Sequence, residues 1–251
     1  MTPYPDPFPV PLFMVEQTSS TNSCLHDYFR KEIPPAFTTV LANYQTAGRG
    51  QRGNSWESEE GRNLLFSFFL FPDFLEARRQ FLLSQVIALS IKEMLDTYTD
   101  GISIKWPNDI YWQDRKICGM LIENELQGNY ICQTIAGVGI NINQQEFYSS
   151  APNPVSLWQI THKNHDCIEL LAQVMKRVQE YYTWLLRGNA AMISARYQEA
   201  LFRKKGMYPY IDNHGKFLAE IIRVEPEGFL VLRDSSGKER KYTFKEIQHV
   251  L

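Results

Sequence analysis

The sequence predicts an α+β fold in which a mixed β-sheet is backed by helices and a small β-rich domain follows. Two observations support this. Segments with strand-like and helix-like apolar spacing are interspersed between residues 18 and 202, which favours a mixed sheet with helices packed on it. A compositional break at Arg203-Lys204-Lys205-Gly206 then precedes short alternating segments separated by turn signals. We therefore expect two domains, at residues 1–203 and 204–251.

The first part of the chain alternates between strand and helix candidates. Thr18-Ser19-Ser20-Thr21-Asn22 can start a helix running to about Arg30, because Ser and Thr are good N-caps. Residues 38–45 are β-branched and predict a short strand, and the Phe- and Leu-rich residues 63–71 predict a buried one. Helical spacing of apolar residues predicts a long core-facing helix over residues 75–98.

The remaining elements follow the same reasoning. Strands are expected at residues 102–106, 109–112, 116–125 and 130–142. Helices are expected at residues 167–186 and 191–202. Beyond residue 207, the turn signals indicate a small β-barrel or sandwich.

The composition is that of an ordinary globular protein, with 44% hydrophobic and 22% charged residues. A net charge of −2 shows no general nucleic-acid footprint, so nucleic acid is not an expected partner. The N-terminal segment lacks a signal-peptide pattern, and the most apolar stretch, residues 64–71, is too short to cross a bilayer. We expect a cytoplasmic protein whose four scattered cysteines are buried reduced thiols.

A glycine-rich loop at residues 48–56 carries two arginines, Arg49 and Arg52. Glycines let a backbone approach a ligand closely, and arginines grip phosphate or carboxylate. The loop is therefore a candidate cradle for a nucleotide or an activated acid. Its Gly-x-Gly-x-x-Gly spacing matches the dinucleotide fingerprint, but a polar turn and a strand follow instead of the required helix. A purely structural glycine hairpin is the alternative for the loop taken alone.

Charged residues in two neighbouring segments accompany this loop. Lys105 and Lys116 lie in apolar strand surroundings, where a charge without a partner is costly. Solvated lysines at strand ends are the commoner explanation for either one, but both together with the arginine loop indicate a phosphate-bearing ligand. Asn108 and Asp109 could position Mg²⁺ or orient a lysine, or simply form a turn; no residue is assigned as a direct metal ligand.

A third glycine-bearing segment, Gly137-Val138-Gly139, lies in a predicted strand. Such small residues would permit a flat ring to lie against the backbone. A β-bulge or tight packing is the alternative explanation.

Taken together, these segments resemble the signature of the biotin protein ligases. Its four motifs occur in order at residues 48–58, 105–109, 116–119 and 137–141, and the Ser20-Thr21-Asn22 and Tyr44-Gln45-Thr46-Ala47 segments also match. The resemblance spans about residues 12–200 and a C-terminal region like the family's SH3-like barrel. It implies a class II synthetase-like catalytic domain of the biotin/lipoate ligase type.

The resemblance also implies roles for individual residues. Ser20, Thr21 and Gln45 would hydrogen-bond the ureido ring of biotin. Arg49 and Lys116 would act at the junction of carboxylate and phosphate, and Lys105 would stabilise the attacked α-phosphate. The other implied contacts are Asn22, Gln51, Arg52 and Gly119 for biotin, and Gly48, Gly50, Trp56, Asn108, Asp109 and Asn141 for the nucleotide.

The implied enzyme is an ATP-dependent ligase that works in two steps. Biotin attacks the α-phosphate of Mg·ATP to give biotinyl-5′-AMP and pyrophosphate. A lysine of a biotin carrier domain, such as that of acetyl-CoA carboxylase, then attacks the mixed anhydride and releases AMP. Fixed cations would position the reactants and neutralise developing charge. The loop at residues 48–60 would order over the intermediate to exclude water.

Several alternatives stay open at this point. Many relatives carry arginine at the positions of Gln51 and Asn54, so weaker retention of the adenylate is expected unless Arg52 substitutes. The nearest rival function is a lipoate ligase or octanoyltransferase, followed by a nicotinamide oxidoreductase and a non-catalytic binding module. A DNA-binding winged helix is not expected, because the chain starts close to the catalytic region. Homodimerisation through a sheet edge, common in the family, is not decided by the sequence.

Overall fold

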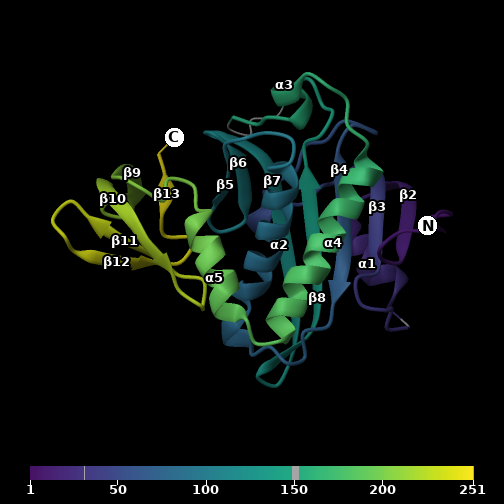
Figure 1. Ribbon diagram of the computed structural model, residues 1–251, viewed down its shortest axis with the longest axis horizontal. Coiled ribbons are helices and arrows are strands. Elements are labelled where there is room, and N and C mark those ends of the chain that lie inside the picture. The colour runs from purple at the N-terminus through teal and green to yellow at the C-terminus, as the bar shows by residue number, and fades with distance from the viewer. Residues whose placement is uncertain (31, 149–152, 251) are drawn as a thin grey trace.

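The protein, a computed structural model describing residues 1–30, 32–148 and 153–250, contains two β-sheets (Figure 1). The side chain of Arg52 lies outside this description. The large sheet has, in spatial order, β1 (Thr2–Pro3), β2 (Leu12–Thr18), β3 (Thr39–Gln45), β4 (Leu64–Leu70), β8 (Tyr130–Ile140), β7 (Arg115–Gln127), β6 (Asp109–Trp112) and β5 (Ile102–Lys105). The second sheet has β12 (Glu239–Tyr242), β11 (Leu230–Asp234), β10 (Gly215–Val224), β9 (Tyr208–Asp212) and β13 (Gln248–His249).

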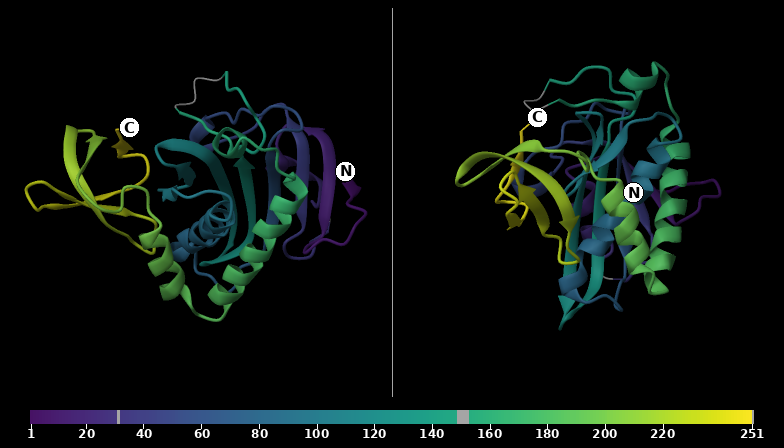
Figure 2. Two further views of the ribbon diagram at one scale, coloured as in Figure 1. Left: turned by 45° about the horizontal axis from the view of Figure 1, so that its top comes forward. Right: turned by 60° about the vertical axis from the view of Figure 1, so that its left-hand side comes forward.

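Helices pack against the large sheet (Figures 1 and 2). The described α-helices are α1 (Thr21–Tyr28), α2 (Phe81–Leu95), α3 (Leu157–Thr161), α4 (Cys167–Leu186) and α5 (Ala190–Glu199). Two short 3₁₀ turns are η1 (Gln51–Gly53) and η2 (Ala77–Arg79). The carboxylate of Asp166 starts α4 by accepting from the backbone N–H groups of Ile168 and Glu169.

The alternation of β4 shows which helices cover which face. Leu64, Phe66 and Phe68 pack into a large buried cluster that contains residues of α2 and α4. Phe69 points the other way and packs against Leu25 of α1. Because successive side chains of a strand point to opposite faces, α1 covers the face opposite to α2 and α4. The mixed sheet backed by helices is therefore confirmed.

The strand β2 was not predicted from the sequence. It pairs in parallel with β3, and α1 forms the crossover between them, so the chain contributes one βαβ unit to a sheet whose other ladders are antiparallel. Its sequence has an apolar run of only four residues, Leu12 to Val15, followed by three polar residues, and most of the strand is half-buried or exposed. The long helix also begins later than predicted, at Phe81, because η2 interrupts the helical spacing that starts at residue 75.

The C-terminal sheet is antiparallel throughout, as expected for short alternating strands. Its order runs from β12 to β13 as an open sheet, and within the described residues no pairing between those two strands closes a barrel. Its core is continuous with that of the large sheet, since Tyr210 and Leu230 belong to the same buried cluster. The indole N–H of Trp106 also donates to the carbonyl of Gly228, at 3.0 Å.

The expectation of four buried reduced thiols is correct only in part. All four cysteines are free thiols, but only Cys118 is fully buried. Within the described part of the chain, no helix has the combined length and apolar character that crossing a bilayer requires.

Candidate active site

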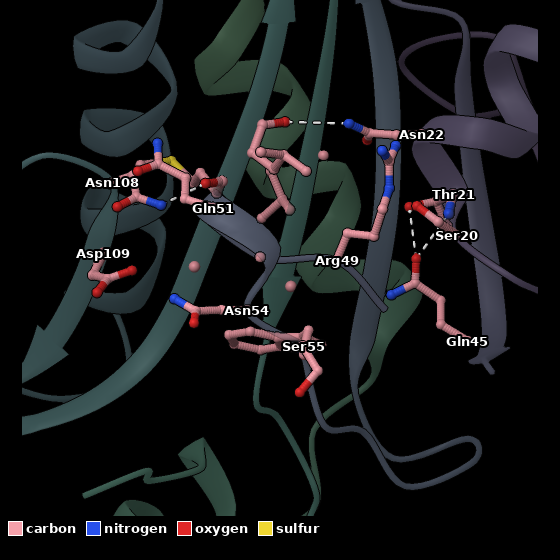
Figure 3. Close-up of a pocket in the computed structure, with 18 of the residues that line it drawn as sticks. Ser20, Thr21, Asn22, Gln45, Arg49, Gln51, Asn54, Ser55, Asn108 and Asp109 are labelled. Atoms are coloured by element: carbon pink, nitrogen blue, oxygen red, sulfur yellow. Dashed lines mark hydrogen bonds between the residues drawn. The ribbon is translucent and has the colours of Figure 1, made fainter. Parts of the chain in front are cut away.

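A cavity of about 230 Å³ lies on the α1 face of the large sheet. Figure 3 shows Asn108 and Asp109 on one side of it, and Ser20, Thr21 and Arg49 on the other. The predicted residues that line it are Ser20, Thr21, Asn22, Gln45, Arg49, Gly50, Gln51, Trp56, Asn108, Asp109, Lys116 and Gly119. Arg49 and Lys116, from motifs far apart in the sequence, thus share one cavity.

The parallel pairing of β2 and β3 builds the uncharged end of the cavity. Thr18 and Gln45 are cross-strand partners at the carboxyl ends of the two strands, and α1 starts just beyond Thr18. The carbonyl oxygen of the Gln45 amide accepts from Thr21 N–H at 2.8 Å and from the Thr21 hydroxyl at 3.1 Å (Figure 3). Since this oxygen is occupied, the Gln45 NH₂ group is the part that can donate to a ligand. Ser20 is the N-cap of α1, yet its hydroxyl makes no capping bond and can serve a ligand instead.

Asn22 connects this end to Arg49 through residues that the sequence analysis did not single out. Its amide NH₂ donates to the carboxylate of Glu123 at 2.6 Å, and its oxygen lies 2.6 Å from the hydroxyl of Ser67. The same oxygen of Glu123 lies 3.3 Å from Nη2 of Arg49. A signal for Ser67 was present, because it is the lone polar residue in the otherwise apolar β4.

Glycines form the floor of the cavity. Gly119 of β7 and Gly139 of β8 are cross-strand partners, and the indole of Trp56 lies over both. A Cβ atom would come within 3.0 Å of this ring at Gly119 and 2.5 Å at Gly139. Of the two glycines expected to admit a flat ring, Gly139 is covered by the indole of Trp56 and Gly137 by the side chain of Asn22. Within the described residues, the buried Nε1 of Trp56 has no hydrogen-bond partner.

The two predicted lysines differ in their surroundings. Nζ of Lys116 lies 2.7 Å from a carboxylate oxygen of Asp109, and both side chains line the cavity. Lys105 does not line it; its Nζ donates to the hydroxyl of Tyr111 at 3.0 Å. Burial lowers the pKa of Lys105, and the charges of Lys116 and Arg203 add to this while Asp109 opposes it.

The glycine loop does not lead into a helix. It forms η1 (Gln51–Gly53), then extended backbone at Asn54, and β4 begins at Leu64. A dinucleotide fingerprint requires a helix whose N-terminus receives the pyrophosphate, so the Rossmann interpretation fails.

The comparison with known proteins agrees with this arrangement. Residues 14–141 match the Biotin/lipoate A/B protein ligase family. The chain belongs to this family. It is 29% identical over 232 residues to the bifunctional ligase/repressor BirA of Bacillus subtilis, covering 90% of this chain and 70% of that protein.

Two further ligases of this family match the chain over most of their own length. The biotin–[acetyl-CoA-carboxylase] ligase of Paracoccus denitrificans is 29% identical over 216 residues, covering 80% of this chain and 85% of that protein. The solved structure of the Aquifex aeolicus biotin protein ligase in complex with biotin and ATP is similar with a TM-score of 0.78 and 27% identity. The match covers 95% of this chain and 99% of that one. The predicted mixed α+β fold followed by a C-terminal β-sheet is thus confirmed, whereas closure of that sheet into a barrel is not seen in the described residues.

Of the remaining residues implied by the ligase signature, some line the cavity and others do not. Asn108 lines the cavity but donates to the carbonyl of Met120, at 2.7 Å. Gly48 and Asn141 are not part of the lining; Asn141 donates to the carbonyl of Val155, at 3.1 Å. The side chain of Arg52 lies outside the described residues. The roles assigned to these residues stay predictions.

Mg²⁺ would have few protein ligands in this ligase. No group of three or more His, Cys, Asp or Glu side chains suited to a metal occurs among the residues described. Asp109 and Asn108 offer oxygen atoms at the cavity wall. Because Mg²⁺ commonly binds through one or two carboxylates together with substrate phosphates and water, these residues fit a metal that arrives with ATP.

Proposed function

We propose that this chain is a biotin–protein ligase that activates biotin with ATP and transfers it to a lysine of a biotin carrier domain. The observation that carries the proposal is one cavity lined both by uncharged hydrogen-bonding groups and by two cations, Arg49 and Lys116. The relatives support it, since they are named as biotin–protein ligases and the Aquifex structure contains biotin and ATP.

The uncharged groups and the cations of the cavity suit the two ends of biotin. The ureido group presents two donors and one acceptor, which the groups of Ser20, Thr21 and Gln45 can match. The carboxylate would extend toward Arg49 and Lys116, whose positive charges attract it and later the phosphate. We assign Ser20, Thr21, Asn22 and Gln45 to the ring, and Arg49 and Lys116 to the reacting groups.

In the first step, the carboxylate oxygen of biotin forms a bond to the α-phosphorus and pyrophosphate leaves. Arg49 and Lys116 neutralise the charge on the α-phosphate as the oxygen attacks. Lys116 must therefore exchange its partner Asp109 for the phosphate. Asp109 and Asn108 would offer oxygen ligands to Mg²⁺, which when bound would neutralise charge on the triphosphate.

In the second step, the ε-amine of the carrier lysine attacks the acyl carbon of the mixed anhydride. An amide bond forms, the bond to the phosphate oxygen breaks, and AMP leaves while the amine loses a proton. The name of the Paracoccus relative supports an acetyl-CoA carboxylase carrier domain as the protein substrate. Water must be excluded during this interval, and the loop at residues 48–60 remains the segment we expect to close.

Lipoate is the competing substrate, because the family includes lipoate ligases. An aliphatic acyl chain would leave the hydrogen-bonding groups of Ser20 and Gln45 without partners, which disfavours it. ATP–pyrophosphate exchange with biotin or with lipoate decides between them. Exchange with biotin alone is expected. Exchange with lipoate alone would overturn the substrate assignment, and exchange with neither would favour a binding module.

Four further assignments belong to this proposal. We assign residues 1–203 to the catalytic domain and residues 204–251 to the second domain, and limited proteolysis that cuts far from residue 203 would contradict this boundary. A cytoplasmic location and the lack of a nucleic-acid partner are expected, and fractionation and a DNA-binding assay test them. Sedimentation analysis measures whether the chain forms a homodimer.

A further inference from the structure

Ser67 is a buried hydroxyl in a strand that is otherwise apolar. All seven residues of β4 are buried, and Ser67 faces α1 while its neighbours Phe66 and Phe68 face the large core. It does not line the cavity. Its Oγ lies 2.6 Å from Oγ1 of Thr21 and 2.6 Å from Oδ1 of Asn22.

The strand beside Ser67 leaves room for Asn22. Gly137 of β8 is the cross-strand partner of Ser67. A Cβ atom at Gly137 would lie only 2.2 Å from Oδ1 of Asn22, so the Asn22 side chain occupies the space that any other residue would fill. Ser67 and Gly137 together form a socket that fixes the first turn of α1.

A continuous polar network passes through this socket. The amide oxygen of Gln45 contacts Thr21, Thr21 contacts Ser67, and Ser67 contacts Asn22. Asn22 then donates to Glu123, which pairs with Arg49. The network therefore connects the uncharged groups of Gln45 and Thr21 to the cation of Arg49, and Ser67 is the member that links Thr21 to Asn22.

We propose that Ser67 is a positioning residue for biotin binding, which holds Thr21 and Asn22 in the geometry that receives the ring. This inference rests on the proposed function. The Ser67 hydroxyl has one proton and free lone pairs, so it can donate to Oδ1 of Asn22 while its oxygen accepts from the Thr21 hydroxyl, and the two contacts restrain both side chains. Thr21 and Asn22 are themselves buried, and a lost hydrogen bond there frees their rotamers and weakens ligand binding.

The test is biotin affinity, measured by calorimetry without ATP on the full chain. Ser67→Ala is expected to raise the biotin Kd by roughly three- to tenfold, the effect of one buried hydrogen bond. The biotin KM in pyrophosphate exchange should rise similarly while the ATP KM stays constant. The biotin Kd of Ser67→Cys, which keeps a weaker donor, should lie between those of the wild type and of Ser67→Ala.

Ser90→Ala is the matched control. Ser90 is an equally buried serine of α2 whose hydroxyl donates to the carbonyl of Val86, away from the cavity. Ser90→Ala should leave the biotin Kd unchanged. Gly137→Ala should raise the biotin Kd, because the added Cβ atom displaces Asn22.

The outcomes separate this inference from the proposed function. If the wild-type chain does not bind biotin, the proposed function itself is refuted. Wild-type binding together with an unchanged Kd in Ser67→Ala would refute the positioning role. If Ser67→Ala does not fold, the biotin Kd values of Ser67→Cys and Gly137→Ala test the positioning role instead. A wild-type Kd in both variants would refute that role.

Discussion

The pH dependence of stability tests how the second sheet packs on the first. His249 of β13 has its ring 4.9 Å from that of Tyr210, and both ring nitrogens are buried without a partner among the described residues. Burial, and then the charges of Lys105 and Arg203, lower the pKa of His249 to about 3. The folded chain thus holds this imidazole neutral at a pH where the unfolded chain protonates it.

The sign and size of the effect follow from linkage. The unfolded histidine titrates near 6.5. Because its folded pKa is depressed, its contribution is fully present above pH 6.5 and is lost as the pH falls toward 3. The slope below the unfolded value is about 1.4 kcal/mol per pH unit for one group. Lowering the pH from about 7 to about 5 should therefore cost about 2 kcal/mol of unfolding free energy through this residue.

Urea unfolding at several pH values measures this slope. His249→Gln removes the titration, so the difference between the wild-type and variant curves isolates His249 from the carboxylates that both proteins share. His214→Gln, at an exposed histidine in the turn between β9 and β10, is the control. Parallel curves for wild type and His249→Gln between pH 5 and pH 7 would show that this histidine is not held neutral, and the reasoning would fail.

Three predictions concern the cavity and use biotin-dependent pyrophosphate exchange or adenylate release. Gly139→Ala places a Cβ atom 2.5 Å from the Trp56 ring and should reduce exchange by about 10²-fold, so a wild-type rate would contradict the glycine floor. Lys116→Met should reduce exchange by roughly 10²–10³-fold, while Lys92→Met, at a remote ion pair, should not. Gln51→Arg should slow the release of biotinyl-AMP, and equal off-rates would dismiss a role for the missing arginine.

Much of the fold was predictable because its long elements have strong patterns. The helix α4 and the strand β4 lie close to their predicted ranges, since amphipathic spacing and dense apolar sequence leave few alternatives. The strand β2 was missed because its apolar run is only four residues long and its polar second half is held in the sheet by pairing with β3. Such pairing is a tertiary property that no local pattern encodes.

The site was predictable at the level of its motifs. Glycines, lysines and arginines in a fixed order placed Arg49 and Lys116 together, and the structure brings both to one cavity. The partners of these groups were predictable only in part. The sequence analysis offered Asp109 as a residue that could orient a lysine, but that this lysine is Lys116 depends on how β6 and β7 pair. The pairing of Glu123 with Arg49 was not predicted, because it depends on how the glycine loop lies over β7.

The position of Trp56 gives the protein an optical reporter. Its indole rests on the glycine backbone with Lys116 Nζ 5.6 Å from the ring, so a ligand entering the cavity alters the polarity around this chromophore. The chain has five tryptophans, and comparison with Trp56→Phe would isolate the emission of this one. Occupancy of the pocket could then be followed in real time by intrinsic fluorescence, without a label on biotin or the nucleotide.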